Sequence, residues 1–260
     1  MNDEALSFRE REIASALPAE LDSLPRLSGF RLRGLDMTRL ETFVDATFAF
    51  AITMLVIAGQ QVPDRIDVLL DAFKNVPAFA ASVASLAIFW RGHWLWSRRY
   101  GLEDGFSIVI SWALIFTMLI YVYPLKIIFS AMFYAISGHR VGQFITAQTI
   151  GQIRALFAVY ALGFIALALE IILLNVRAWR LRKALRLNPL ETALTRMEII
   201  GWSIPAGVGT LSLVCALTLA REHIDWAGWC YFLMSLLIPI YRSIGRKKLQ
   251  ALRAKGTITD

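Results

Sequence analysis

The chain has 260 residues, of which 57% are hydrophobic and 18% charged, with a formal net charge of +7 at pH 7. Soluble domains carry about 45–50% apolar and about 25% charged residues, so this composition indicates an integral membrane protein. Two cysteines, Cys215 and Cys230, are too few for a disulfide scaffold. Because the positive charge lies beside hydrophobic stretches, we attribute it to membrane orientation and expect no nucleic-acid partner.

Residues 1–38 form a polar extension of mixed charge, interrupted by Pro18, Pro25 and Gly34. The extension lacks the apolar core of a secretory signal peptide. We expect it to be cytoplasmic, with a short helix near residues 3–16.

Six apolar blocks follow the extension, at residues 41–60, 77–97, 105–133, 154–176, 198–219 and 223–243. Each block provides the roughly 20 helical residues that cross a bilayer core of about 30 Å. Backbone groups in lipid must be paired, which favours a helix in each block. The sequence therefore predicts an all-α integral membrane bundle of six transmembrane helices over residues 39–245, followed by a basic cytoplasmic tail at residues 246–260.

Lysine and arginine are distributed unevenly between the loops. With the N-terminus inside, the inside loops hold 14 of these residues and the outside stretches hold 5. The positive-inside rule then predicts that both termini are cytoplasmic. As a separate expectation, we place this multi-pass protein in a cell inner membrane. The basic loop at 177–197 is expected to be helical up to Pro189 and to contact anionic membrane lipids.

The sequence contains no enzyme signature: it has no Walker loop, no zinc-type His/Cys spacing and no nucleophile elbow. We therefore expect no catalytic residue, no metal site and no cofactor. Ionisable residues inside lipid are functional candidates because burying them costs free energy. Asp45 and His93 fall at similar cytoplasmic depth, near Arg39 and Arg91, and we expect one polar cluster that joins the first two helices. Glu170 is expected to pair with a basic residue nearby.

The first apolar block also has a seam of residues spaced four, three, four, three and four apart: Phe43, Thr47, Phe50, Met54, Ile57 and Gln61. This spacing places the residues along one side of a helix. Such a seam is ordinarily a packing face, and the alternative is a pore lining whose apolar constrictions gate by dewetting.

Two motifs resemble those of the transmembrane protein 175 family of lysosomal and bacterial potassium channels. The stretch from Arg39 through Phe43 to Asp45 resembles the R-x-x-x-F-S-D signature of its first helix, and Phe89–Trp94 resembles its F-W-x-x-H-H stretch. A weaker match is Tyr123-Pro124-Leu125, where the family often has a Pro-Phe pair. In length, topology and motif order, the resemblance covers residues 37–245 and is to a bacterial-type, single-repeat member.

The resemblance implies an oligomeric, potassium-permeable cation channel, with potassium as the permeant ion. Bacterial members resemble homotetramers in which helix one of each subunit lines the pore. Carried onto this chain, the apolar constriction rings match Phe50, Met54 and Ile57, and the threonine that contributes to selectivity matches Thr53. The polar network that braces the pore helices matches a further set: Arg39, Phe43, Asp45, Trp90 and His93.

The chain departs from the family pattern at three positions. Val44 replaces the signature serine, Trp94 stands where a second histidine is usual, and Phe50 is larger than the typical aliphatic residue of the first ring. Two other functions stay open: a proton-coupled or small-molecule transporter using Asp45, His93 and Glu170, and a non-conducting scaffold. Transporters often contain an internal repeat, and blocks one to three and four to six show none, which favours the channel.

Overall fold

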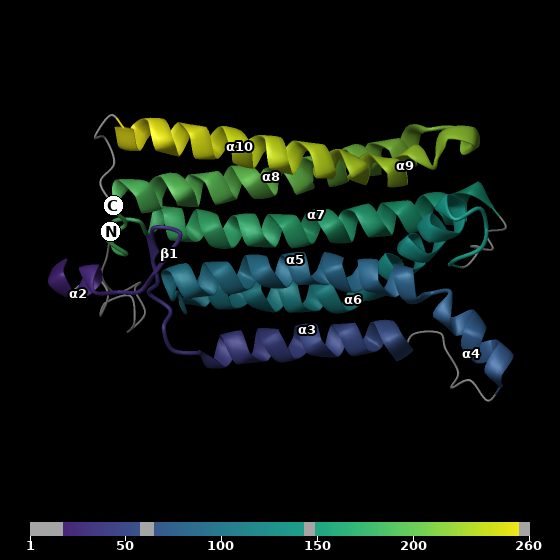
Figure 1. Cartoon of the computed structure of the whole chain (residues 1–260), viewed down its shortest axis with the longest axis horizontal. Coiled ribbons are helices and arrows are strands. Elements are labelled where there is room, and N and C mark those ends of the chain that lie inside the picture. Colours follow the sequence, from purple (N-terminus) through teal and green to yellow (C-terminus); the bar gives the residue numbers. More distant parts are fainter. Residues whose placement is uncertain (1–17, 58–64, 143–148, 255–260) are drawn as a thin grey trace.

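The computed structural model describes residues 18–57, 65–142 and 149–254, which form a bundle of long helices with a short β-hairpin at one end (Figure 1). The elements in chain order are α2 (Pro18–Asp22), β1 (Arg26–Leu27), β2 (Phe30–Arg31), α3 (Arg39–Ile57), α4 (Ile66–Phe73), α5 (Val76–Tyr100), α6 (Gly105–Ile136), α7 (Ile150–Arg180), α8 (Pro189–Thr218), the 3₁₀ turn η2 (Arg221–His223), α9 (Trp226–Trp229), η3 (Cys230–Phe232) and α10 (Leu233–Ala254).

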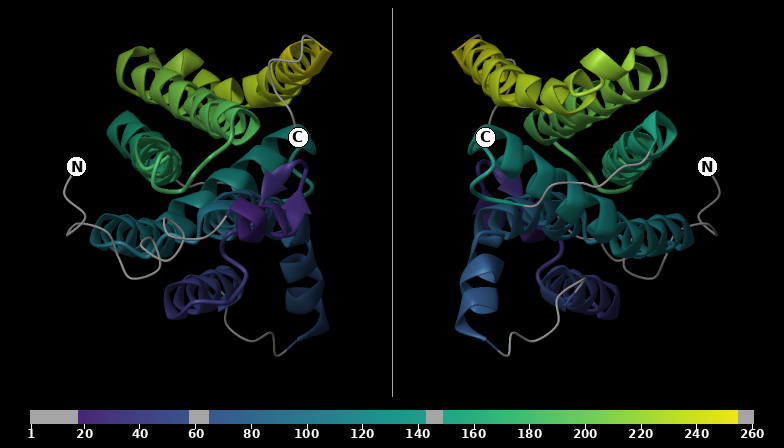
Figure 2. Two further views of the ribbon diagram at one scale, coloured as in Figure 1. Left: turned by 90° about the vertical axis from the view of Figure 1, so that its left-hand side faces the viewer. Right: turned by 90° about the vertical axis from the view of Figure 1, so that its right-hand side faces the viewer.

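The long helices lie side by side in layers. Helix α3 packs on α5 and α6, these two pack on α7, α7 packs on α8, and α8 packs on α10. Figures 1 and 2 show α3 at one edge of the bundle and α10 at the other. The core lies between the middle helices and includes Leu86, Phe89, Met118, Phe164 and Leu167, all of them buried. Helix α3 is therefore covered from one side only.

Four helical segments in the described part of the chain are long and apolar enough to cross a membrane: α6, α7, α8 and the stretch Arg221–Gln250. Helices α4 and α5 meet at a bend of 44° and give a fifth span if they cross as one. Residues 58–60 of the first apolar block and the helix expected near 3–16 lie outside the described residues. The all-α membrane bundle is confirmed, whereas the count of six spans stays a prediction.

The connection between α7 and α8 differs from the helical loop expected up to Pro189. Helix α7 ends at Arg180, and Pro189 begins α8 instead of ending a helix. Proline is favoured in the first turn of a helix, where its missing N–H needs no partner. Asn188 and Glu191 complete a capping box: the Asn188 Oδ1 accepts from the Glu191 amide at 2.7 Å, and the Glu191 Oε2 accepts from the Asn188 amide at 3.0 Å.

The extension that precedes the bundle contains a hairpin that the sequence analysis did not predict. Strands β1 and β2 pair antiparallel, with Arg26 opposite Arg31 and Leu27 opposite Phe30. The two turn residues, Ser28 and Gly29, both have positive φ, at 54° and 83°. Two-residue hairpin turns of this hand match the right-handed twist of the strands. The hairpin lies at the end of the bundle where α3 begins (Figure 1).

Candidate functional site

Helix α3 presents two different sides. Its buried side carries Val44, Phe48, Ala51 and Leu55, spaced four, three and four apart and no more than 3% exposed. An α-helix has 3.6 residues per turn, so these residues form one stripe facing α5 and α6. The other side is uncovered in the single chain.

The residues expected to line a pore fall on or beside the uncovered side of α3. Phe50 is 55% exposed, and Thr53 is exposed while its hydroxyl donates to the Ala49 carbonyl oxygen at 3.0 Å. Met54 is half-buried and packs against the core. Ile57 ends the helix, and its side chain, like Gln61, lies outside the described part of the structure.

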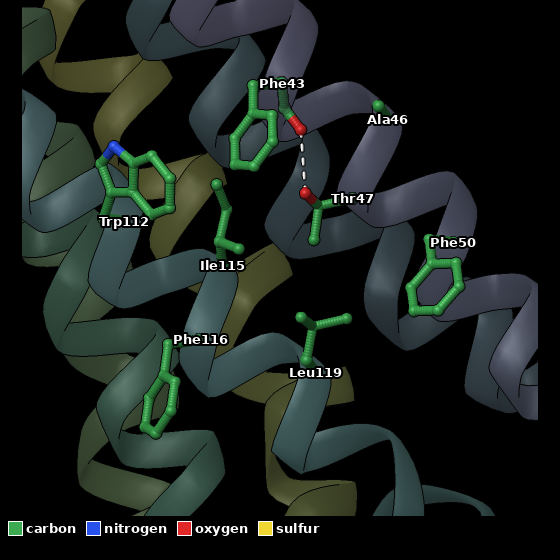
Figure 3. A pocket seen from close by; sticks show the side chains of 8 residues that line it. All are labelled: Phe43, Ala46, Thr47, Phe50, Trp112, Ile115, Phe116 and Leu119. Atoms are coloured by element: carbon green, nitrogen blue, oxygen red, sulfur yellow. Dashed lines mark hydrogen bonds between the residues drawn. The ribbon is translucent and has the colours of Figure 1, made fainter.

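A groove of about 410 Å³ lies between α3 and α6, at the border between the buried and the uncovered side of α3 (Figure 3). Its walls are apolar, with aromatic rings on both helices. Four of its residues come from α3 and four from α6: Phe43, Ala46, Thr47 and Phe50, and Trp112, Ile115, Phe116 and Leu119. The Thr47 hydroxyl donates to the Phe43 carbonyl oxygen at 2.9 Å. The centroids of the Phe43 and Trp112 rings lie 5.0 Å apart, so the Phe43 side chain contacts an aromatic ring of α6.

Asp45 joins α3 to α5. Its Oδ1 accepts a hydrogen bond from the Trp90 Nε1 at 2.8 Å. The Trp90 ring in turn stacks on Trp94, with centroids 6.4 Å apart. Trp94, at the position where the resemblance led us to expect a histidine, stacks on the tryptophan that holds Asp45.

His93 makes a separate contact with α6. Its side chain is buried, and its Nε2 lies 3.1 Å from the Ser111 Oγ. Three residues turn a helix by about 300°, so Trp90 and His93 point in directions about 60° apart. Trp90 meets α3, whereas His93 meets α6. Among the described residues no hydrogen bond joins Asp45 to His93, so the single cluster expected from depth alone resolves into two contacts.

The cationic partners differ from the expected ones. Arg39 and Arg91 are both exposed. The ion pair that joins the start of α3 to α5 is instead Arg98 Nε to Glu41 Oε1, at 3.1 Å, with both side chains largely buried. The sequence analysis missed this pair, although opposite charges at equal depth on adjacent helices were a signal for it.

Glu170 is buried within α7, with a neutral partner. Its Oε1 accepts a hydrogen bond from the Thr117 hydroxyl of α6 at 2.7 Å. The expectation of a basic partner is therefore wrong for the described residues, where no ion pair includes Glu170. The described residues also contain no group of three or more His, Cys, Asp or Glu side chains placed to hold a metal ion.

Comparisons with known proteins point to the same family as the motifs. A family model described as "Endosomal/lysosomal potassium channel TMEM175" matches residues 39–124. A protein of Marivirga tractuosa described as a potassium channel is 32% identical over 226 residues, covering 84% of this chain and 90% of its own length. The crystal structure of a variant of the potassium channel MtTMEM175, in complex with a nanobody–MBP fusion protein, aligns with a TM-score of 0.73 and 30% identity. That alignment covers 87% of this chain and 100% of the MtTMEM175 chain.

The helix bundle and these matches define a multi-pass membrane protein of the ion-channel class, and not an enzyme. The chain belongs to the TMEM175 family of potassium channels, as a bacterial-type member.

Proposed function

We propose that the chain is the subunit of a homotetrameric, potassium-permeable channel in which α3 of each copy lines a central pore. The observation that carries this proposal is the uncovered side of α3, which bears Phe50 and Thr53 at the edge of the bundle. A helix that lines a symmetry axis needs one side held by its own subunit and one side left open. We propose potassium as the permeant ion because the relatives are described as potassium channels.

The proposed pore contains stacked apolar rings, because an axial element repeats each of its residues in every subunit. Phe50 and Met54 would lie about 6 Å apart along the pore, and Met54 and Ile57 about 4.5 Å apart, from the rise of 1.5 Å per residue. Apolar rings at a narrow point act as barriers, since they cannot replace the water that an ion loses. Phe50, the largest of the three, would set the narrowest point.

Thr53 would provide the polar group nearest to these rings. Its hydroxyl proton is already donated to Ala49, so the oxygen lone pairs remain to accept from water or to face a cation. Asp45, held by Trp90 about two turns nearer the start of α3 than Thr53, would bias the adjacent mouth toward cations. The polar network proposed to hold the start of α3 has three further members. Phe43 contacts Trp112 of α6, His93 contacts Ser111 of α6, and Arg39 lies in the first turn of α3.

We further propose six membrane spans in a bacterial inner membrane, with both termini cytoplasmic. The uneven distribution of lysine and arginine supports this orientation. Helix α2 and the end of α10 lie at the same end of the bundle, as an even number of spans requires (Figure 1).

The rival transporter mechanism would need Asp45, His93 and Glu170 on one path. Their hydrogen-bond partners are separate: Trp90, Ser111 and Thr117, respectively. This separation favours the channel.

Cysteine accessibility along α3 tests the proposed pore. Phe50→Cys and Thr53→Cys, in a Cys215→Ser/Cys230→Ser background, should react with a water-soluble thiol reagent, and the reaction should block potassium current in planar bilayers. Leu55→Cys is the matched control, because Leu55 lies on the same helix and is fully buried. Equal reactivity at all three positions, or block at none, would exclude α3 as the pore lining.

Subunit number and ion preference are measured separately. Native mass spectrometry should give four times the 29.3 kDa of the chain, and the reversal potential under potassium and sodium gradients should favour potassium. A monomer, or a current without preference for potassium, would contradict the proposal.

A further inference from the structure

The segment Pro18–Thr38, which we name the N-terminal strap, is built into the end of the bundle. Phe30 is fully buried, and its ring meets the Tyr100 ring edge to face at 5.4 Å. The Arg99 guanidinium lies 5.0 Å from the centroid of the same ring. The Tyr100 hydroxyl donates to the Thr195 Oγ1 of α8 at 2.8 Å. The hairpin therefore fills the space where the end of α5 meets the start of α8.

Two arginines of the strap converge on one carboxylate of α8. The Glu191 Oε2 lies 2.8 Å from the Arg33 Nη2 and 3.0 Å from the Arg31 Nη2. The Glu191 Oε1 accepts from the Arg31 backbone amide at 2.9 Å and from the Arg33 Nη1 at 3.2 Å. The two guanidinium groups also bind backbone: Arg33 Nε donates to the Leu185 carbonyl at 3.0 Å, and Arg31 Nη2 donates to the Arg186 carbonyl at 3.1 Å.

We name the cluster of Arg31, Arg33 and Glu191 the anchor of the strap, and within it Arg31 is held in its charged form. Hydrogen bonding to Glu191 is the largest influence on Arg31 and raises its pKa further above its ordinary value, although burial acts in the opposite direction. Asp22 adds a second ion pair to Arg31 at 3.1 Å. Buried ion pairs of fixed geometry hold two elements in one arrangement, since a shift leaves charges without partners.

The strap continues directly into the start of α3. The Gly34 amide donates to the Arg98 carbonyl at 3.0 Å, and the Arg98 Nη1 donates back to the Gly34 and Leu35 carbonyls at 3.0 and 2.9 Å. The same guanidinium pairs with Glu41 in the first turn of α3. Only residues 36–38 separate the strap's last hydrogen bond to α5 from the start of α3, and three residues reach at most about 11 Å.

We propose that the N-terminal strap is a positioning element for the pore helix: it ties the first turn of α8 and the end of α5 to the start of α3. This inference rests on the proposed function, in which α3 lines the pore. A relative movement of α8 and α5 is then passed to α3 through the strap, and each of the four subunits holds its constriction residues at the same height. Arg31, Arg33 and Glu191 act through the position of α3 and do not contact the ion.

The first test removes the anchor without leaving a buried charge. The variant Arg31→Gln/Arg33→Gln/Glu191→Gln keeps polar side chains of similar size but removes all three charges. In planar bilayers, its potassium-to-sodium permeability ratio should change at least threefold, while its assembled mass stays that of the unmodified channel. Arg26→Gln is the matched control, since Arg26 lies exposed in the same hairpin. A correctly assembled triple variant with a smaller change would overturn the inference.

The second test cuts the strap in channels that are already folded, and it decides the question if the triple variant fails to assemble. A protease site replaces residues 35–37, which are exposed, and protease is added to both chambers during recording. Cleavage should change the potassium current at least fivefold. The same site placed at residues 138–140, also exposed and at the other end of the bundle, controls for handling.

A smaller change on cleavage at 35–37 would overturn the inference, whatever the control shows. The thiol experiment at Phe50 and Thr53 separates the two proposals. If those positions still block while cleavage has no effect, the strap inference alone fails. If they do not block, the pore assignment fails and the strap inference fails with it.

Discussion

Arg33 and Glu191 lie 158 positions apart in the chain, yet their side chains form an ion pair of 2.8 Å with both side chains fully buried. Two such charges are stable inside a protein only where further hydrogen bonds satisfy their remaining atoms. Glu191 meets this condition with Arg31, Arg33 and the Asn188 amide, and it also completes the capping box of α8. One carboxylate therefore starts a membrane helix and holds the segment that leads into α3.

Glu191→Gln should lower the free energy of unfolding by about 3–5 kcal/mol, because it leaves the buried Arg33 guanidinium without its counter-charge and leaves Arg31 with Asp22 alone. This loss is measured by titrating the purified protein in detergent with a denaturing surfactant and recording its unfolding. Glu222→Gln is the control, since Glu222 is exposed, and it should change stability by less than about 0.5 kcal/mol. Equal effects of the two changes would contradict the anchor.

Trp90→Phe should weaken the contact between α3 and α5. The change keeps an aromatic ring but removes the Nε1 donor to Asp45, at a cost of about 0.5–1.5 kcal/mol for a hydrogen bond at an exposed site. Thermal unfolding in detergent reports the effect. Trp94→Phe, at the ring stacked on Trp90, removes the same group from a neighbouring residue and should cost less. The hydrogen bond is unimportant if both variants unfold at the same temperature.

Phe50→Ala and Leu55→Ala should have opposite consequences, although they are five residues apart on one helix. Trimming the exposed Phe50 should widen the proposed constriction, raising single-channel conductance and weakening the preference for potassium. Trimming the fully buried Leu55 should leave a cavity and cost about 2–5 kcal/mol of stability. Conductance recordings and unfolding measurements on both variants check the contrast, which reversed results would refute.

Gly34→Ala should destabilise the protein. A Cβ at this position would collide with the Ser97 carbonyl oxygen and lie 3.3 Å from the Arg98 Cα, and both are backbone atoms that cannot rotate away. We expect a cost of about 1–3 kcal/mol. Gly207→Ala serves as the comparison, because nothing lies within 4 Å of its Cβ position inside α8. There the better helix propensity of alanine should add about 1 kcal/mol to stability. Similar melting temperatures for the two variants would contradict the close approach of Gly34 to α5.

The sequence by itself determined the class of protein and most of its helices. Apolar runs of about 20 residues are local features, and helices α5, α6 and α7 contain the predicted blocks and extend them by a few residues at one or both ends. The family was also readable from sequence, because Arg39, Phe43 and Asp45 lie close together in one helix. The buried and uncovered sides of α3 were less certain, since the periodicity of the seam suited either packing or a pore lining.

Tertiary structure decided the partners of the polar groups. Arg31 and Arg33 belong to a segment expected to be a plain polar extension, and only the fold brings them to Glu191. His93 meets Ser111 instead of Asp45, because the rotation of α5 about its own axis depends on packing against α3, α6 and α7 together. Apolar burial is nondirectional, so it can be recognised from the pattern of apolar residues in a short stretch of sequence. A hydrogen bond or ion pair instead needs two particular atoms within about 3 Å of each other. That proximity is a property of the whole packed bundle, so it was set only when the helices came together.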